Sequence, residues 1–175
     1  KVVAGLSVAG RNHPDLEKIM GMFVNLLPLV SHPVADKTLV AFLREVKQAT
    51  LLAFENQDVP FDSLVDRLVG KRALGENAIV EVILNFITKG DEVVDQKDIE
   101  KTQFLHLESS KRYDLPLNVT QYANTFALAL QYDAGLFSAA TVRQFLKYLL
   151  HLLAQFRTGG AQRLSTLHLE PAANI

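Results

Sequence analysis

Residues 23–30 read Phe-Val-Asn-Leu-Leu-Pro-Leu-Val, a short apolar run that is typical of a β-strand. Pro28 cannot donate to a β-ladder, so we expect this strand at a sheet edge or bulged at the proline. The stretch from about Thr38 to Asn56 then spaces its apolar residues by three and four, which predicts an amphipathic helix. These residues are Leu39, Phe42, Leu43, Val46, Ala49 and Ala53. A strand followed by such a helix indicates an α/β domain.

More strands are predicted on both sides of this stretch. Val2–Val8 is a buried strand by its apolar, β-branched composition, and Ile79–Ile87 alternates so little that we expect a central strand covered on both faces. Three further strands are predicted near 104–108, 115–121 and 125–132. A tight Ala123-Asn124 turn joins the last two into a hairpin, where Asn tolerates a positive φ.

The remaining helices are marked by their caps. Asn12 or His13 begins a short one before Pro14, and Asp62 or Ser63 begins another. Ser138 caps a long helix that ends at Gly159-Gly160, with an inner face of Val142, Phe145, Leu146, Leu149, Leu152, Leu153 and Phe156. We therefore expect a two-layer α/β sandwich, a mixed β-sheet packed by helices.

The amino-acid composition excludes several classes of function. The chain has 175 residues, 49% of them apolar, and a net charge of −1, which gives no basic surplus for binding a nucleic acid. With no Cys it has neither disulfides nor a thiolate nucleophile. No apolar run approaches the roughly 20 residues that a membrane span requires. We expect a cytoplasmic protein, and the start in a strand without Met suggests a piece of a larger one.

Few residues suggest catalysis or metal binding. The five His are not clustered at metal-ligand spacing, so we expect no metal site. His32 and Asp36 have the spacing of a base held by a carboxylate one turn away. Asp36 is equally well placed to be the N-cap of the following helix, and we favour that interpretation. We therefore predict no catalytic residue in this chain.

Two polar features stand out against the apolar pattern. Asn25 lies in an apolar strand, and a buried amide must either bond to protein or face a wet cavity. Residues 56–62, Asn-Gln-Asp-Val-Pro-Phe-Asp, follow an apolar helix and are typical of a built corner, in which side-chain oxygens satisfy backbone groups.

These same segments carry a family resemblance. Residues 10–17 (Gly-Arg-Asn-His-Pro-Asp-Leu-Glu) and 20–29 (Met-Gly-Met-Phe-Val-Asn-Leu-Leu-Pro-Leu) resemble the fifth core motif of condensation domains of non-ribosomal peptide synthetases. Residues 56–62 resemble the sixth, and Arg72, Leu74 and Asn77 outline the seventh. Segments 112–115 and 131–137 resemble the last strands and last helix. Leu26 and Val30 depart from the usual Thr and Arg.

The resemblance implies a half-domain of the chloramphenicol acetyltransferase-like fold. The family's His-His-x-x-x-Asp-Gly signature belongs to the N-terminal lobe and is absent here, so residues 1–160 resemble the C-terminal lobe. Such a domain joins an acyl or peptidyl thioester to an aminoacyl thioester, both carried on phosphopantetheine arms of donor and acceptor carrier proteins. This chain would bind no cofactor itself. We expect Asn25 to face the tunnel, and the tunnel floor to be shaped by Phe23, Gln57, Asp58, Pro60 and Phe61.

Residues 161–175 resemble the linker towards an adenylation domain. Leu164, Leu167 and Leu169 alternate with polar residues, so we expect the segment to pack on a neighbouring surface. Two alternatives to the condensation reading remain: a lobe of a free-standing acyltransferase of the same superfamily, and a non-catalytic lobe that only docks carrier proteins.

Overall fold

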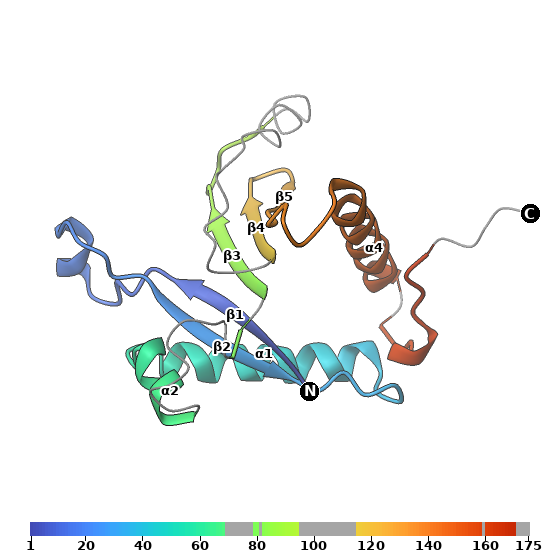
Figure 1. The fold of residues 1–175 in the computed structure, drawn as a ribbon, viewed down its shortest axis with the longest axis horizontal. Coiled ribbons are helices and arrows are strands. Elements are labelled where there is room, and N and C mark those ends of the chain that lie inside the picture. The colour runs from blue at the N-terminus through green and yellow to red at the C-terminus, as the bar shows by residue number, and fades with distance from the viewer. Residues whose placement is uncertain (69–78, 81, 95–114, 159, 171–175) are drawn as a thin grey trace, which may run out of the picture.

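The computed structural model describes residues 1–68, 79–80, 82–94, 115–158 and 160–170 (Figure 1). Within them a mixed sheet has the order β2-β1-β3-β4-β5, formed by β1 (Val2–Val8), β2 (Asn25–Ser31), β3 (Val82–Thr88), β4 (Leu115–Gln121) and β5 (Phe126–Leu130). The β1–β3 and β3–β4 pairs are parallel, and the two outer pairs are antiparallel. This order confirms that the strand predicted at Ile79–Ile87 lies in the middle of the sheet. The expectation that it is covered on both faces is wrong for the described residues, since Phe86 and Ile87 are 47% and 48% exposed. Pro28 lies in the edge strand β2, as its missing donor predicts.

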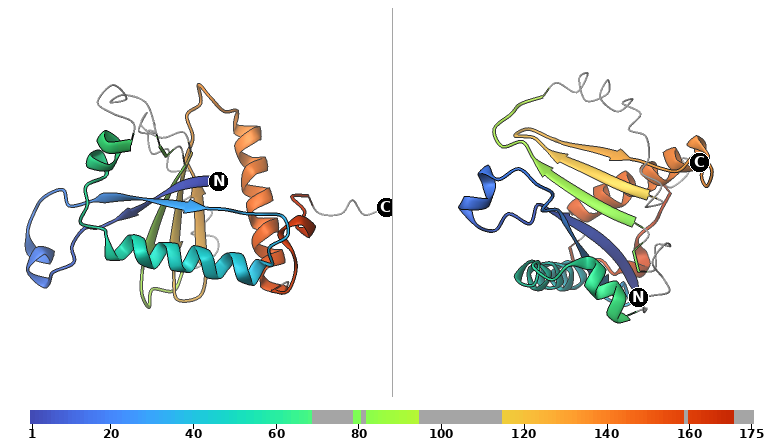
Figure 2. Two further views of the ribbon diagram at one scale, coloured as in Figure 1. Left: turned by 90° about the horizontal axis from the view of Figure 1, so that it is seen from below. Right: turned by 60° about the vertical axis from the view of Figure 1, so that its left-hand side comes forward.

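Three helices of eight or more residues accompany the described sheet: α1 (Leu39–Glu55), α2 (Phe61–Leu68) and α4 (Ala139–Thr158). Figures 1 and 2 show α1 and α4 on the same side of the curved sheet, which is the expected two-layer α/β sandwich. Two short 3-10 helices, η1 (Pro14–Lys18) and η3 (Leu164–Thr166), lie in the connections.

The core consists of two clusters, because successive residues of a strand point to opposite faces. On the side of α1, Leu6, Val8 and Leu27 pack together with Ala53. On the other face, Leu26 and Ile83 pack with Val80, and Phe61 from α2 joins them. The connection between α1 and α2 therefore passes around the edge strand β2, so that the two helices reach different faces.

The helix starts correct two expectations. Thr38, not Asp36, is the N-cap of α1, since its Oγ1 accepts a hydrogen bond from the backbone N–H of Ala41 at 3.3 Å. The second correction is at α2, which begins one residue early, at Phe61. Ser138 caps α4 as expected, with its Oγ accepting from the N–H of Thr141 at 3.1 Å.

The hairpin of β4 and β5 is confirmed, but its turn is not built as expected. Among the described residues no side-chain-bearing residue has a positive φ, so Asn124 does not use the left-handed region. Instead its amide pairs with the backbone of Val94, donating to the carbonyl at 3.0 Å and accepting from the N–H at 3.4 Å. The strand predicted near 104–108 lies outside the described residues, as do the segments at 72–77 and 112–114.

The inner face of α4 is only partly covered. Val142 is buried, whereas Phe145 and Leu153 are 38% and 44% exposed, contrary to the sequence expectation. The described residues therefore cover only part of the apolar face of α4.

The chain returns to the body of the domain at residues 160–170, here called the tail. The backbone carbonyl of Gln162 accepts from the N–H of Leu39 at 2.8 Å, and the N–H of Leu164 donates to the backbone carbonyl of Lys37 at 2.9 Å. Further along, Gln155 of α4 donates to the carbonyl of His168 at 2.7 Å and accepts from its N–H at 3.1 Å. The predicted docking of the tail is confirmed, but the contacts that show it are hydrogen bonds, and Leu169, one of the three leucines expected to pack, is 54% exposed. None of the described helices has the length and apolar character needed to cross a membrane.

Candidate functional site

Asn25, the first residue of β2, holds the corner between α1 and α2 (residues 56–61). Its amide nitrogen donates to the carbonyls of Gln57 and Val59, both at 2.8 Å. Its amide oxygen accepts from the N–H of Phe61 at 3.1 Å and from the N–H of Leu26 at 2.9 Å. The sequence left open whether the Asn25 amide bonds to protein or faces a wet cavity, and the structure shows that it bonds to protein. All its polar positions are used, so Asn25 acts as a clamp on the corner.

A second contact ties the corner to the connection between β1 and β2, residues 10–24, here called the arm. Asn12 donates from its amide to Asp58 Oδ1 at 2.6 Å. The arm begins at Gly10, whose φ is +63° and whose Cα faces the backbone of Phe23 so closely that an added Cβ would lie 1.9 Å from that carbonyl oxygen. Only glycine fits there.

Arg11 organises the interior of the arm. Its guanidinium lies 4.4 Å from the centroid of the Phe23 ring, a cation–π contact. The same group donates to the carbonyls of Ile19 at 2.9 Å and Gly21 at 3.2 Å, and also to that of Leu16. A single side chain therefore satisfies three carbonyls of a segment that has little core of its own.

The tip of the arm is apolar and exposed. Met20 and Met22 are 98% and 92% exposed, and Figure 1 shows the arm projecting away from the sheet. Side chains of this kind normally lie against another surface. The arm is thus a preorganised segment whose apolar tip has no partner among the described residues.

The six residues predicted from the sequence come together in this region. Asn25 contacts the backbone of Gln57 and Phe61, Asp58 binds the arm, and Phe23 stacks under Arg11. The carbonyl of Pro60 accepts from the N–H groups of Ser63 and Leu64 and so starts α2. Their lining of a tunnel stays a prediction.

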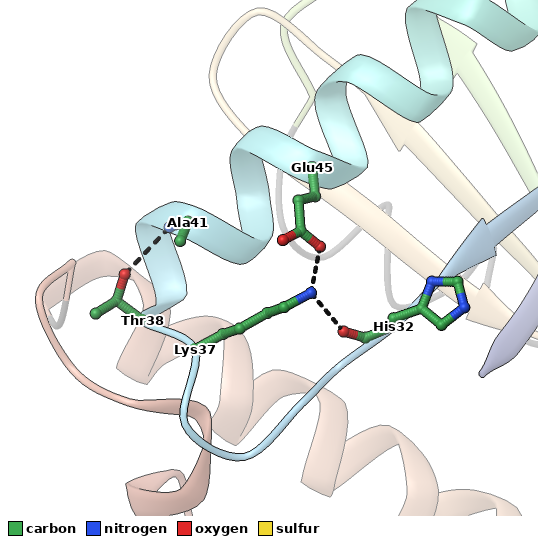
Figure 3. Close-up of polar contacts among 5 residues, drawn as sticks. All are labelled: His32, Lys37, Thr38, Ala41 and Glu45. Atoms are coloured by element: carbon green, nitrogen blue, oxygen red, sulfur yellow. Dashed lines mark hydrogen bonds and ion pairs between the residues drawn. The ribbon is translucent and has the colours of Figure 1, made fainter.

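The His32 and Asp36 pair is not formed. Figure 3 shows Lys37 Nζ donating to the carbonyl of His32 at 3.0 Å and to Glu45 Oε2 at 2.6 Å, with the His32 ring turned away. Asp36 instead lies 3.4 Å from Arg163 of the tail. The described residues contain no group of three or more His, Asp or Glu that could hold a metal ion.

Sequence reasoning missed a second polar feature, which we call the polar row. Ser7 of β1 donates its hydroxyl to Asn85 Oδ1 at 2.6 Å, and Asn85 Nδ2 donates to Asn118 Oδ1 of β4 at 2.8 Å. The available signal was an amide in the middle of two apolar strands, Asn85 in β3 and Asn118 in β4, the same feature that singled out Asn25. Asn118 also opens an Asn-Val-Thr sequon, and its Oδ1 accepts the hydrogen bond from Asn85.

The amino-acid sequence of the chain was compared with those of known proteins. A family model described as "Condensation domain" matches residues 1–174. Gramicidin S synthase 2 of Aneurinibacillus migulanus is 34% identical over 155 residues, which are 87% of this chain and 4% of that protein. The chain thus spans a small part of such relatives.

Solved structures share the fold. The X-domain from teicoplanin biosynthesis, in its complex with OxyB, superimposes with a TM-score of 0.78 at 22% identity and covers 97% of this chain and 38% of that one. The first condensation domain of the CDA synthetase gives 0.70 at 16% identity, with 97% and 38% covered. Because the family model covers nearly every residue, the chain belongs to the condensation-domain family.

Proposed function

We propose that this chain is the C-terminal lobe of a condensation domain that forms amide bonds in non-ribosomal peptide biosynthesis. Support comes from coverage: nearly the whole chain matches a solved condensation domain, yet it accounts for only 38% of it. The segments that resemble the fifth and sixth motifs become the arm, the start of β2 and the corner, which are joined by the Asn25 clamp.

The reaction joins two carrier-bound substrates. The amine nitrogen of an aminoacyl thioester attacks the carbonyl carbon of the donor thioester, the amine loses a proton, and the donor's phosphopantetheine thiol leaves. The step calls for a base and for donors to the tetrahedral oxyanion. The corner and the arm offer no such pair, since the amide of Asn25 is fully engaged. We therefore assign the base to the His-His-x-x-x-Asp-Gly signature of an N-terminal lobe.

The role of this chain is then architectural. The clamp is the observation that carries this assignment, because one amide fixes an edge strand, a corner and, through Asp58, the base of the arm. A wall fixed in this way can keep two entering phosphopantetheine arms aligned. The exposed tip with Met20 and Met22 suits contact with the partner lobe. Further partners are the donor and acceptor carrier proteins and an adenylation domain beyond the docked tail.

The test uses the intact condensation domain and this chain alone. Both are incubated with carrier proteins loaded with donor and acceptor, and amide product is followed by mass spectrometry. Product from the intact domain and none above background from the chain alone is the expected result. Amide formation by the isolated chain would refute the assignment of the chemistry to another lobe.

One observation supports the alternative of a non-catalytic lobe that only docks carrier proteins. The fold matches the teicoplanin X-domain, which was solved with OxyB, as well as it matches a condensation domain. A lobe of this fold therefore occurs in a domain that was solved in complex with another protein. With a non-catalytic lobe, the intact domain would bind loaded carriers but release no amide. A free-standing acyltransferase would instead accept a coenzyme A thioester in place of a loaded carrier.

A further inference from the structure

The polar row crosses the middle of the sheet. Asn85 is paired with Asn118 in the parallel β3–β4 register, and Ser7 lies one residue beyond the Leu6–Leu84 pair. The three half-buried side chains therefore point to one face and stand side by side. Leu26 precedes the row on β2 and Ala129 follows it on β5.

This is the face opposite α1. By register its β1–β2 side carries apolar residues such as Leu26 and Ile83, and its β4–β5 side carries smaller ones. In β5, for example, Ala127 and Ala129 share the face of the row, while Phe126, Leu128 and Leu130 point the other way. Within the five described strands, the face of the row has no charged residue. A ligand that lies here meets the neutral polar groups of the row with apolar residues on either side of them.

The hydrogen bonds of the row have one direction. Ser7 donates to Asn85, and Asn85 donates to Asn118, whose Oδ1 is thereby occupied. The Nδ2 group of Asn118 has two N–H donors and no acceptor among the described residues. It stands beside Ala129, which is exposed and too small to cover it. The row therefore ends in a fixed pair of N–H donors.

Donors of this kind suit a neutral carbonyl oxygen rather than a phosphate or carboxylate, which would favour a positive charge. The face is also continuous with the candidate site, because Phe61 of the corner packs against the cluster that contains Leu26, the neighbour of Ser7. A ligand that passes the corner on this face reaches the row next.

We propose that Asn118 is a binding residue for an amide carbonyl of the substrate arm, with Ser7 and Asn85 as positioning residues that fix its orientation. The substrate class is the amide-containing phosphopantetheine arm that carries an acyl or aminoacyl thioester. This inference rests on the proposed function, since that function brings such an arm to this lobe.

The experiment compares two probes on the intact condensation domain by titration calorimetry. One is a non-hydrolysable aminoacyl pantetheine thioether, which has the two pantetheine amides. The other carries the same aminoacyl group on butanethiol and lacks those amides. Replacing Asn118→Ala should raise the Kd of the pantetheine probe about two- to tenfold, the value of one hydrogen bond, and leave the butanethiol probe unchanged. Asn118→Asp should weaken the pantetheine probe further, because a carboxylate oxygen would face the carbonyl.

Controls separate binding from folding. Thr120→Val alters the same strand and face without touching the row and should bind both probes as the unaltered domain does. Ser7→Ala removes the anchor of the row and should show a smaller loss with the same preference between probes. Where Asn118→Ala fails to fold, Asn118→Ser takes its place.

The outcomes are distinct. Unchanged binding of the pantetheine probe, or equal weakening of both probes, would overturn the role of Asn118. Equal weakening would point instead to contact of the row with another part of the protein. If the unaltered domain makes no amide from loaded carriers but binds pantetheine in an Asn118-dependent way, the proposed function fails and this inference stands.

Discussion

Replacing Asn25→Ala should destabilise the protein, because the side chain makes three hydrogen bonds to the corner. Two of them, to the carbonyl of Gln57 and from the N–H of Phe61, are partly buried, and the third, to Val59, is exposed. At about 0.5–1.5 kcal/mol each, with the exposed one at the low end, the loss is about 2–3 kcal/mol. For a unit of 150–250 residues that unfolds by itself, this corresponds to a decrease in Tm of about 4–12 °C, and the decrease is smaller for the intact domain because its unfolding entropy is larger.

The measurement is thermal unfolding of the intact condensation domain, together with its rate of amide formation. Asn12→Ala is the matched control, since it removes one exposed amide bond and should cost less than about 1 kcal/mol. Asn25→Asp is a second variant, which keeps the accepting oxygen but sets a carboxylate oxygen against two carbonyls, and should lose at least as much. A normal Tm with slowed amide formation in Asn25→Ala would refute the clamp and favour the tunnel-facing role.

Three further predictions concern the arm, the corner and the tail. Gly10→Ala should prevent normal folding of the arm, because the added Cβ would clash with the carbonyl of Phe23. Gly90→Ala, with a φ of +61° but open space around it, should lower the free energy of unfolding by only about 1–2 kcal/mol in chemical denaturation. Equal losses of stability in the two variants would argue against the clash. Asp58→Ala should cost less than about 1 kcal/mol, and the double variant with Asn12→Ala should show coupling in a mutant cycle, because each loses the same bond. Gln155→Ala should speed protease cleavage of the tail, because it removes both bonds to His168; unchanged cleavage in mass-spectrometric mapping would show that other contacts hold the tail.

Local signals in the sequence were enough for most elements of the fold. The strand at 115–121 and the helix from Leu39 were predicted closely because periodicity and capping depend on neighbours within a few residues. Pro28 predicted an edge strand because a proline has no N–H to donate to a neighbouring strand, whatever the fold. Local signals failed where two residues could each be the N-cap of α1. Thr38 is the cap, and Asp36 lies instead near Arg163, which is 127 residues away in the sequence.

The candidate site was found from the sequence, but its chemistry was not. Asn25 and the corner stood out because they are polar segments beside apolar ones, but the sequence left open whether the Asn25 amide bonds to protein or faces a cavity. The polar row was not found at all, because Ser7 and Asn85 are 78 residues apart and meet only when β1 pairs with β3 in one register.

The sequence by itself therefore determined the elements, the edge position of β2 and the family, because each depends on short stretches of residues. Tertiary structure alone decided which polar atoms are satisfied and which remain free. A hydrogen bond needs two groups within about 3 Å, and for Asn25 and Asn118 strand register and the path of the chain around β2 bring the partners together.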